Sequence, residues 1–138
     1  MATSSKYSNS VIVKSSSIHG RGVFATRAFK KNEVVVYWKN TKEISRDEFD
    51  NLPIKEQKFT DIQNGKILLV GEPERFVNHC CDHNTISGNL CDVASRDINE
   101  GEEITSNYSN FFILDGSFEC QCRSSNCRRI IKGRNAEE

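Results

Sequence analysis

The chain has 138 residues, of which 36% are hydrophobic, a length that fits one domain with a core of its own. Its 19 basic and 19 acidic residues give a net charge of zero, so we expect no general electrostatic attraction to nucleic acid. No run approaches the roughly 18 apolar residues of a membrane span, and the N-terminus lacks a secretory signal pattern, so we expect an intracellular protein without membrane binding.

Short strands dominate the predicted elements. Each expected strand is rich in β-branched or aromatic residues and is bounded by residues that favour turns. In chain order the expected strands are residues 11–14, 22–26, 33–38, 66–71 and 90–95. One short helix is expected, since Ser45 can cap its first turn, Glu48 can complete a capping box, and Pro53 ends the run. The sequence predicts a small, mainly β domain with flexible tails at residues 1–8 and 133–138.

The charges are distributed unevenly along the chain. Residues 41–116 carry 15 acidic and seven basic side chains, whereas residues 1–40 carry one acidic and seven basic side chains. This acidic stretch is either an ordinary solvated face or a surface that prefers basic peptides to phosphates, and both interpretations stay open. The acidic residues that would form such a surface include Glu43, Asp47, Glu48, Asp50, Glu72 and Glu74.

The cysteines indicate a metal site. Cys120, Cys122 and Cys127 form a C-x-C-x4-C cluster, and a structural zinc ion needs a fourth ligand. Cys80 and Cys81 are adjacent in the sequence, and two adjacent thiolates point apart and seldom bind the same ion. The candidates for the fourth ligand, in order of preference, are Cys81, Cys80 and Cys91. Disulfides are disfavoured because the signal sequence is absent and because Cys120 and Cys122 are crowded together.

Four segments carry a resemblance to a known family. They are SIHGRGVFA at 17–25, RFVNHCCDHN at 75–84, GEEITSNYS at 101–109 and CQCRSSNC at 120–127. In this order and spacing the chain resembles the SET-domain protein lysine methyltransferases, in particular small stand-alone bacterial-type members with a post-SET zinc segment. The resemblance implies a SET-domain (β-clip) fold of small sheets with a pseudoknot, one short helix and a C-terminal zinc-binding loop. It divides the chain into a SET domain at 9–116 and a post-SET segment at 117–132.

The same resemblance implies cofactor-binding residues. Gly20, Arg21 and Gly22 match a loop whose backbone holds the methionine part of S-adenosylmethionine, and glycine suits a close backbone approach. Asn78 and His79 match an Asn-His pair that contacts the same cofactor. A simpler interpretation stays open for each of the pair, namely a turn cap for Asn78 and a structural histidine for His79.

Catalytic and metal-binding roles are also implied. Tyr108 matches the catalytic tyrosine, and Tyr37 matches an aromatic residue that lines the lysine channel; the alternative for Tyr37 is a core position in a strand. Ser106 and Asn107 depart from the family pattern, in which an aromatic residue and an aspartate are usual. The implied ligands of one structural zinc ion are Cys81, Cys120, Cys122 and Cys127.

The function implied by the resemblance is protein lysine N-methylation with S-adenosylmethionine as the methyl donor. The expected partner is a basic, lysine-containing protein or peptide such as a histone, and the expected location is cytoplasmic, or nuclear and associated with chromatin. The alternative is a catalytically weak or inactive SET-like module that binds peptides and whose fold is stabilised by zinc. The altered Ser106-Asn107 pair keeps that alternative open.

Overall fold

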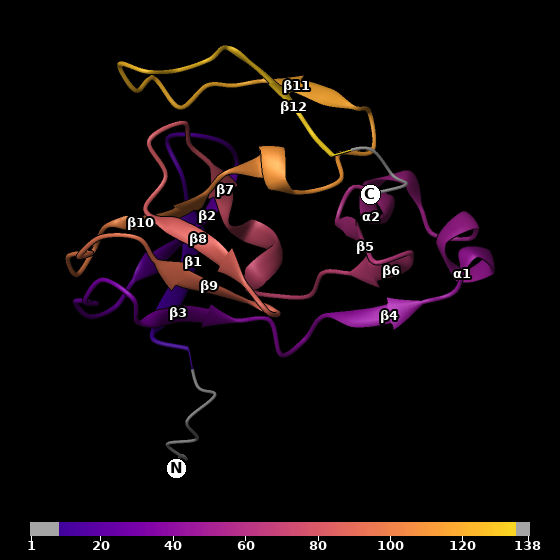
Figure 1. Ribbon diagram of the computed structural model, residues 1–138, viewed down its shortest axis with the longest axis horizontal. Coiled ribbons are helices and arrows are strands. Elements are labelled where there is room, and N and C mark those ends of the chain that lie inside the picture. Colours follow the sequence, from indigo (N-terminus) through magenta and orange to yellow (C-terminus); the bar gives the residue numbers. More distant parts are fainter. Residues whose placement is uncertain (1–8, 135–138) are drawn as a thin grey trace.

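The structure, a computed structural model, describes residues 9–134, so the predictions for residues 1–8 and 135–138 lie outside the described residues. Within this range the strands form four small sheets (Figure 1). The strands are β1 (Val11–Ser15), β2 (Arg21–Ala25), β3 (Val34–Tyr37), β4 (Lys42–Ile44), β5 (Thr60–Gln63), β6 (Lys66–Leu69), β7 (Asn78–His79), β8 (Thr85–Gly88), β9 (Cys91–Ala94), β10 (Glu103–Ser106), β11 (Ser117–Glu119) and β12 (Ile130–Lys132). The helical segments are α1 (Arg46–Asp50), α2 (Ile54–Gln57) and two short 3₁₀ turns, η1 (Glu74–Phe76) and η2 (Tyr108–Asn110).

The five predicted strands are confirmed as β1, β2, β3, β6 and β9, with ends that differ by two residues at most. They are distributed over three sheets, with strand orders β1-β2-β10-β7, β3-β9-β8 and β4-β6-β5. The mainly β fold class predicted from the sequence is therefore correct. The fourth sheet is the β11-β12 hairpin of the C-terminal segment.

The main core joins the β1-β2-β10-β7 and β3-β9-β8 sheets. Val23 and Ile104 from the first sheet and Val36 and Ala94 from the second are fully buried in one cluster. Burial of each large aliphatic side chain contributes about 1.5–3 kcal/mol, so this cluster fixes the two sheets against each other. The same two sheets supply β7, β9 and β10, which carry several of the candidate site residues.

The predicted helix begins as expected. The Ser45 hydroxyl accepts a hydrogen bond from the Glu48 amide at 3.0 Å, and the Glu48 carboxylate accepts one from the Ser45 amide at 2.9 Å, which completes the capping box. Pro53 follows α1 but also precedes a second helix, α2, that the sequence analysis did not predict. In residues 9–134 no helix has the length and apolar character needed to cross a membrane.

A crossing of two distant segments brings the site together. β10 runs parallel to β7, with Thr105 opposite Asn78 and Ser106 opposite His79. Because the β8-β9 hairpin lies between these strands in sequence, the chain returns beside β7 and then carries Tyr108 past it. This arrangement agrees with the predicted pseudoknot.

The C-terminal hairpin packs on this crossing. In Figure 1, β11 and β12 lie at the top, above the body formed by the main sheets. Cys120 and Ile131 are buried there together with Cys81, and Tyr108 and Phe118 pack against the same cluster. A second, smaller core therefore joins the hairpin to the segment around Cys81.

The end of the described chain is held in place. The Gly133 amide donates to the Gly116 carbonyl at 3.0 Å, and the Arg134 amide donates to the Phe111 carbonyl at 2.7 Å. The Arg134 guanidinium also forms an ion pair with the buried Asp61 at 3.1 Å. Residues 133 and 134 were predicted to belong to a flexible tail, whereas these contacts attach them to the body of the domain.

Candidate active site and metal centre

The loop that precedes β2 is anchored to β7 and β10. The Asn78 side-chain amide donates to the carbonyls of His19 at 3.1 Å and Arg21 at 2.9 Å. It also donates to the Glu103 carboxylate at 3.0 Å, and the Ser16 hydroxyl donates to that carboxylate at 2.9 Å. Glu103 and Ser16 hold the loop in position, and the sequence analysis had not identified either of them.

The two glycines of this loop serve different purposes. Gly20 has a φ of +44°, a conformation that residues with a Cβ rarely adopt. Gly22 is buried so close to Glu103 that a Cβ atom would collide with its carboxylate. Gly20 therefore shapes the turn, and Gly22 allows β2 to lie against β10.

A cavity of about 540 Å³ lies between this loop, β7, η2 and the C-terminal hairpin. Its volume is in the range of small-molecule and cofactor sites. The predicted site residues that line it are Gly20, Arg21, Asn78, His79, Tyr108 and the metal-ligand candidate Cys120. Gly22 and Tyr37 do not line this cavity.

Tyr108 is held on several sides. Its hydroxyl donates a short hydrogen bond to the Val77 carbonyl, and its amide donates to His79 Nδ1 at 3.0 Å. Its ring makes edge contacts with Phe111 and Phe118, with centroids 6.1 Å and 5.7 Å away. The position of the hydroxyl is thus set by packing and by backbone contacts.

The hydroxyl of Tyr108 is a hydrogen-bonding group and not a base. Burial raises its pKa well above the ordinary value, and the nearby carboxylates of Asp92 and Glu103 raise the pKa further. Tyr108 therefore stays protonated at physiological pH. It can orient a reacting group, but it does not remove a proton from one.

His79 connects Tyr108 to the cysteines. Burial, together with the charge of Arg128 and the nearby His83, lowers the pKa of His79 to about 4, so the ring is neutral at pH 7. Because Nδ1 accepts the Tyr108 amide proton, the ring proton is on Nε2 and points at Cys81 Sγ, 3.4 Å away. The His79 ring therefore fixes the Tyr108 amide on one side and Cys81 Sγ on the other.

Four cysteine sulfurs meet beside His79. They belong to Cys81, Cys120, Cys122 and Cys127, and all lie within 4.8 Å of one another. Zinc bound by thiolates at about 2.3 Å places ligand sulfurs roughly 3.8 Å apart, and the Cys81 and Cys120 sulfurs are 3.9 Å apart. Neither Cys80 nor Cys91 belongs to this group. The donor set and its spacing fit one tetrahedral zinc ion.

Backbone amides also point at these sulfurs. The Arg128 amide donates to Cys81 Sγ at 3.2 Å, and the Cys122 amide donates to Cys120 Sγ at 3.4 Å. Hydrogen bonds of this kind stabilise thiolates and orient metal ligands. The cluster therefore offers both the ligands and the surrounding donors of a structural site.

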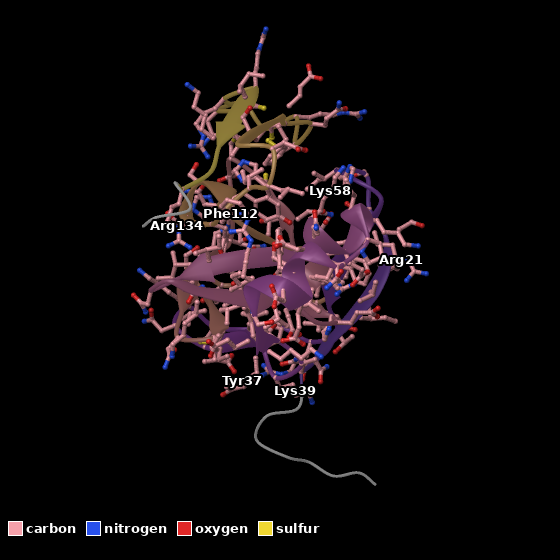
Figure 2. The ribbon with its side chains drawn as sticks, turned by 90° about the vertical axis from the view of Figure 1, so that its right-hand side faces the viewer. Arg21, Tyr37, Lys39, Lys58, Phe112 and Arg134 are labelled. Carbon is pink, nitrogen blue, oxygen red and sulfur yellow. The ribbon has the colours of Figure 1, made fainter. Side chains whose placement is uncertain are left out.

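Trp38, and not its neighbour Tyr37, reaches the cavity. The Trp38 ring stacks on Phe111 with centroids 5.8 Å apart, and its Nε1–H donates to Asp92 at 2.8 Å. In Figure 2, Tyr37 lies at the lower edge of the molecule, well away from the cavity-lining Phe112. Trp38 and Phe111 thus give this cavity an aromatic wall, and the place of Tyr37 in the lysine channel stays a prediction.

The two residues that depart from the family pattern have separate environments. Ser106 is 3% exposed and lines the cavity, where a larger aromatic side chain would reduce the space. The Asn107 side chain accepts hydrogen bonds from the Ser109 amide at 3.1 Å and from Arg128 at 2.9 Å. Asn107 therefore starts η2 and ties it to the C-terminal segment, so an aspartate is not required for that purpose.

Asp92 should make folding stability depend on pH. Burial, opposed by the hydrogen bond from Trp38 and assisted by the charge of Glu74, raises its pKa to about 7. In the unfolded chain an aspartate has a pKa of about 3.9, so stability falls as the pH rises from about 4 to about 7. Asp92→Asn, which cannot ionise, should flatten this decline and be more stable at pH 7. Urea unfolding of both proteins between pH 4.5 and pH 8 measures the difference, and equal slopes would contradict it.

Comparison with known proteins identifies the family. A SET domain profile matches residues 20–109, which is more than half of the chain. The variant-silencing SET domain-containing protein of Plasmodium falciparum is 33% identical over 137 residues, which covers 83% of this chain and 5% of that protein. The histone-lysine N-methyltransferase set1 of Dictyostelium discoideum is 45% identical over 69 residues, covering 44% of this chain and 5% of the relative. The histone-lysine N-methyltransferase SET9 of Gibberella zeae is 32% identical over 131 residues, covering 87% and 19%.

A solved structure has the same fold. A crystal structure of a candidate histone methyltransferase from Plasmodium falciparum superimposes with a TM-score of 0.60, covering 72% of this chain and 92% of that chain. At 20% identity this likeness supports the fold alone. The three relatives above are eukaryotic, and the chain spans only a small part of each, so the likeness to small stand-alone bacterial-type members stays a prediction.

Proposed function

The chain belongs to the SET-domain family, and from this premise we propose that it is a protein lysine N-methyltransferase that uses S-adenosylmethionine. The observation that carries the proposal is the meeting of the Gly20 loop, Asn78 and Tyr108 around one cavity. We also propose that the SET domain comprises residues 9–116 and that residues 117–132 form a post-SET segment. The matched profile ends at residue 109, before the first cysteine of that segment.

When bound, S-adenosylmethionine would supply a methyl group to a neutral lysine amine: the nitrogen–methyl bond forms as the sulfur–methyl bond breaks, which leaves S-adenosylhomocysteine. Free lysine has a pKa of about 10.4, so the amine must lose a proton before it reacts. The aromatic side chains of Trp38, Phe111 and Tyr108 give the cavity a wall of low polarity, which disfavours the charged ammonium. Alignment of the reacting groups in a closed site contributes on the order of 7–11 kcal/mol. In this proposal the Tyr108 hydroxyl and the Val77 carbonyl provide the polar groups that align them.

Asn78→Ala tests the cofactor site. The Asn78 amide holds the carbonyls of His19 and Arg21, so its loss should loosen the loop and weaken binding of S-adenosylhomocysteine by roughly tenfold or more. Isothermal titration calorimetry with S-adenosylhomocysteine measures the change. Asn89→Ala, at an exposed turn, is the matched control and should bind as the wild type does. Unchanged affinity in the Asn78 variant would remove this residue from the cofactor site.

A basic protein, such as a histone tail, is the proposed substrate, in the nucleus and on chromatin. Two of the relatives above are named histone-lysine N-methyltransferases, which supports this choice. Five of the acidic residues named in the sequence analysis are exposed, and they are Glu43, Asp47, Glu48, Asp50 and Glu72. The sixth, Glu74, is only 3% exposed and is therefore not part of an acidic surface.

Methylation of a basic peptide should slow as the salt concentration rises. Attraction between exposed charges is screened over a Debye length that shrinks to a few ångströms between about 0.05 and about 0.5 M salt. A rate series with a histone-tail peptide and labelled S-adenosylmethionine measures the dependence, with cofactor binding followed in parallel at each salt concentration. Rates that do not change with salt, or a preference for acidic peptides, would mean that the acidic residues are only a solvated face.

The alternative is a SET-like module that binds peptides without turnover, and the Ser106-Asn107 pair is the observation that favours it. Two measurements separate the functions. An enzyme should gain thermal stability from S-adenosylhomocysteine and transfer labelled methyl groups to histones or to other basic proteins in a panel. A folded protein that does neither, while still binding lysine-containing peptides, would establish the binding module instead.

A further inference from the structure

Two buried carboxylates share the cavity with Tyr108. Glu74 comes from η1 and is 3% exposed, and Asp92 comes from β9 and is 1% exposed. Both line the cavity, and the charge of Glu74 contributes to the raised pKa of Asp92. Neither has a role in the methyl transfer described above.

Each carboxylate has one oxygen that is held and one that is not. Glu74 Oε2 accepts from the Asn40 amide at 3.1 Å and from the Thr41 hydroxyl at 2.8 Å. Asp92 Oδ2 accepts from Trp38 Nε1 at 2.8 Å. Glu74 Oε1 and Asp92 Oδ1 are buried and have no hydrogen-bond partner among residues 9–134. A buried carboxylate oxygen without a partner is costly, so two in one cavity require an explanation.

The basic residues of the cavity do not supply those partners. The Arg75 guanidinium is committed to Glu56, at 3.1 and 3.2 Å, and to the Val70 carbonyl at 3.0 Å. Arg21 and Lys58 are exposed, and Arg21 lies over the Phe76 ring; neither donates to the free oxygens. The hydrogen-bonded oxygen of each carboxylate fixes the direction of the free oxygen, because the carboxylate cannot rotate without losing those hydrogen bonds. The pair is therefore a preformed acceptor for a cation from outside the chain.

The surroundings favour an organic cation with an apolar stem. The same cavity carries the stacked rings of Trp38 and Phe111, against which the methylene chain of such a cation can pack. An inorganic ion would need more oxygen ligands than two carboxylates and would gain nothing from the rings. A primary ammonium has three N–H donors for the free carboxylate oxygens, and its stem can lie on the aromatic wall.

We propose that Glu74 and Asp92 form an anionic pocket that receives the substrate lysine in its ammonium form, next to the site where the neutral amine reacts. This inference rests on the proposed function, since it assumes a lysine substrate. It divides the task in the cavity: the carboxylates select and draw in the charged side chain, and the less polar wall beside Tyr108 favours its neutral form. The two residues would then determine specificity for lysine over neutral side chains of the same shape.

Trp38 makes this pocket measurable without methyl transfer. It is the only tryptophan of the chain, and its indole contacts Asp92, so its fluorescence reports on the pocket. At pH 8, where Asp92 is mostly ionised, and at constant ionic strength, we expect n-butylammonium to change the fluorescence saturably and to bind at least about tenfold more tightly than n-butanol, its neutral counterpart. Glu74→Gln and Asp92→Asn keep the shape of each side chain and should each remove that preference. Glu100→Gln, an equal change of charge at an exposed position outside the proposed acidic surface, should retain it.

Each outcome of the experiment decides the proposal. Equal binding of the ammonium and the alcohol by the wild type, or an ammonium preference that survives both variants, would overturn it. Displacement of n-butylammonium by Mg²⁺ or Ca²⁺ at low concentration would instead make this a metal site and also overturn it. A protein that shows the ammonium preference but transfers no methyl group would retain the pocket while the proposed enzymatic function fails. Because both substitutions remove a buried charge, the variants are expected to fold, which circular dichroism can verify.

Discussion

Cys122→Ser should disorder the C-terminal segment and abolish methyl transfer. The four cysteine sulfurs lie within 4.8 Å of one another and fit one zinc ion. Structural zinc binding in small sites is worth about 10–16 kcal/mol, comparable with the roughly 5–15 kcal/mol stability of a whole domain. Loss of one ligand should therefore release residues 117–132, which hydrogen exchange can detect as lost amide protection. Elemental analysis should find one zinc per wild-type chain.

The loss should reach the cavity because the metal site and the cavity share residues. His79 contacts Cys81 Sγ through Nε2 and the Tyr108 amide through Nδ1, so a displaced Cys81 also frees Tyr108. Phe118, from the same C-terminal segment, packs against the rings of both His79 and Tyr108. Cys91→Ser is the matched control, since Cys91 is outside the cluster and should leave zinc content and turnover intact. Zinc well below one per wild-type chain, or an ordered segment in the Cys122 variant, would contradict the prediction.

Local sequence was sufficient for the elements whose pattern is local. β1, β2, β3, β6 and β9 were predictable because runs rich in β-branched and aromatic residues are bounded by turn residues, and the capping box of α1 lies within four consecutive residues. The two-residue strand β7 was missed, since its pairing with β10 depends on a distant segment. Its residues were nevertheless identified as site candidates, through the resemblance and not through a strand pattern.

Tyr37 and Trp38 show why neighbours are hard to assign. Adjacent residues of a strand point to opposite faces, so a shift of one residue exchanges the buried and exposed sets. The pairing of β3 with β9 has a register irregularity between Val34 and Val36, just before this point. A bulge of this kind changes the face that the following residues occupy and leaves no clear mark in the sequence. Only the structure could indicate that Trp38 reaches the cavity.

The positioning residues required the three-dimensional structure for a similar reason. Glu103 binds Ser16, 87 positions earlier in the chain, and Asn78, 25 positions earlier. Glu74 and Asp92 looked like ordinary members of an acidic stretch, and burial alone distinguishes them. Charge counts along a chain give the balance of a segment, but they do not separate a solvated carboxylate from one enclosed in a cavity.

Tyr108→Phe should lower turnover by roughly a hundredfold or more while changing affinity for S-adenosylhomocysteine little. The substitution keeps the ring, and with it the contacts to His79, Phe111 and Phe118. It removes only the hydroxyl, which is held at the Val77 carbonyl and stays protonated because burial raises its pKa. The proposed function uses this hydroxyl to align the reacting groups, so its loss should affect kcat and leave cofactor binding intact.

Tyr37→Phe is the matched change outside the cavity. It distinguishes the position of Tyr37 in the structure, outside the cavity, from the role in the lysine channel that the resemblance implies. Tyr37 does not line the cavity, so its hydroxyl should contribute little, and turnover should stay within about threefold of the wild type. Single-turnover rates with labelled S-adenosylmethionine and a basic peptide, compared with calorimetric affinity for S-adenosylhomocysteine, distinguish chemistry from binding for both variants. Wild-type turnover in the Tyr108 variant would exclude its hydroxyl from the reaction. A large loss in the Tyr37 variant would return that residue to the lysine channel and show that the cavity reaches further along β3 than the structure indicates.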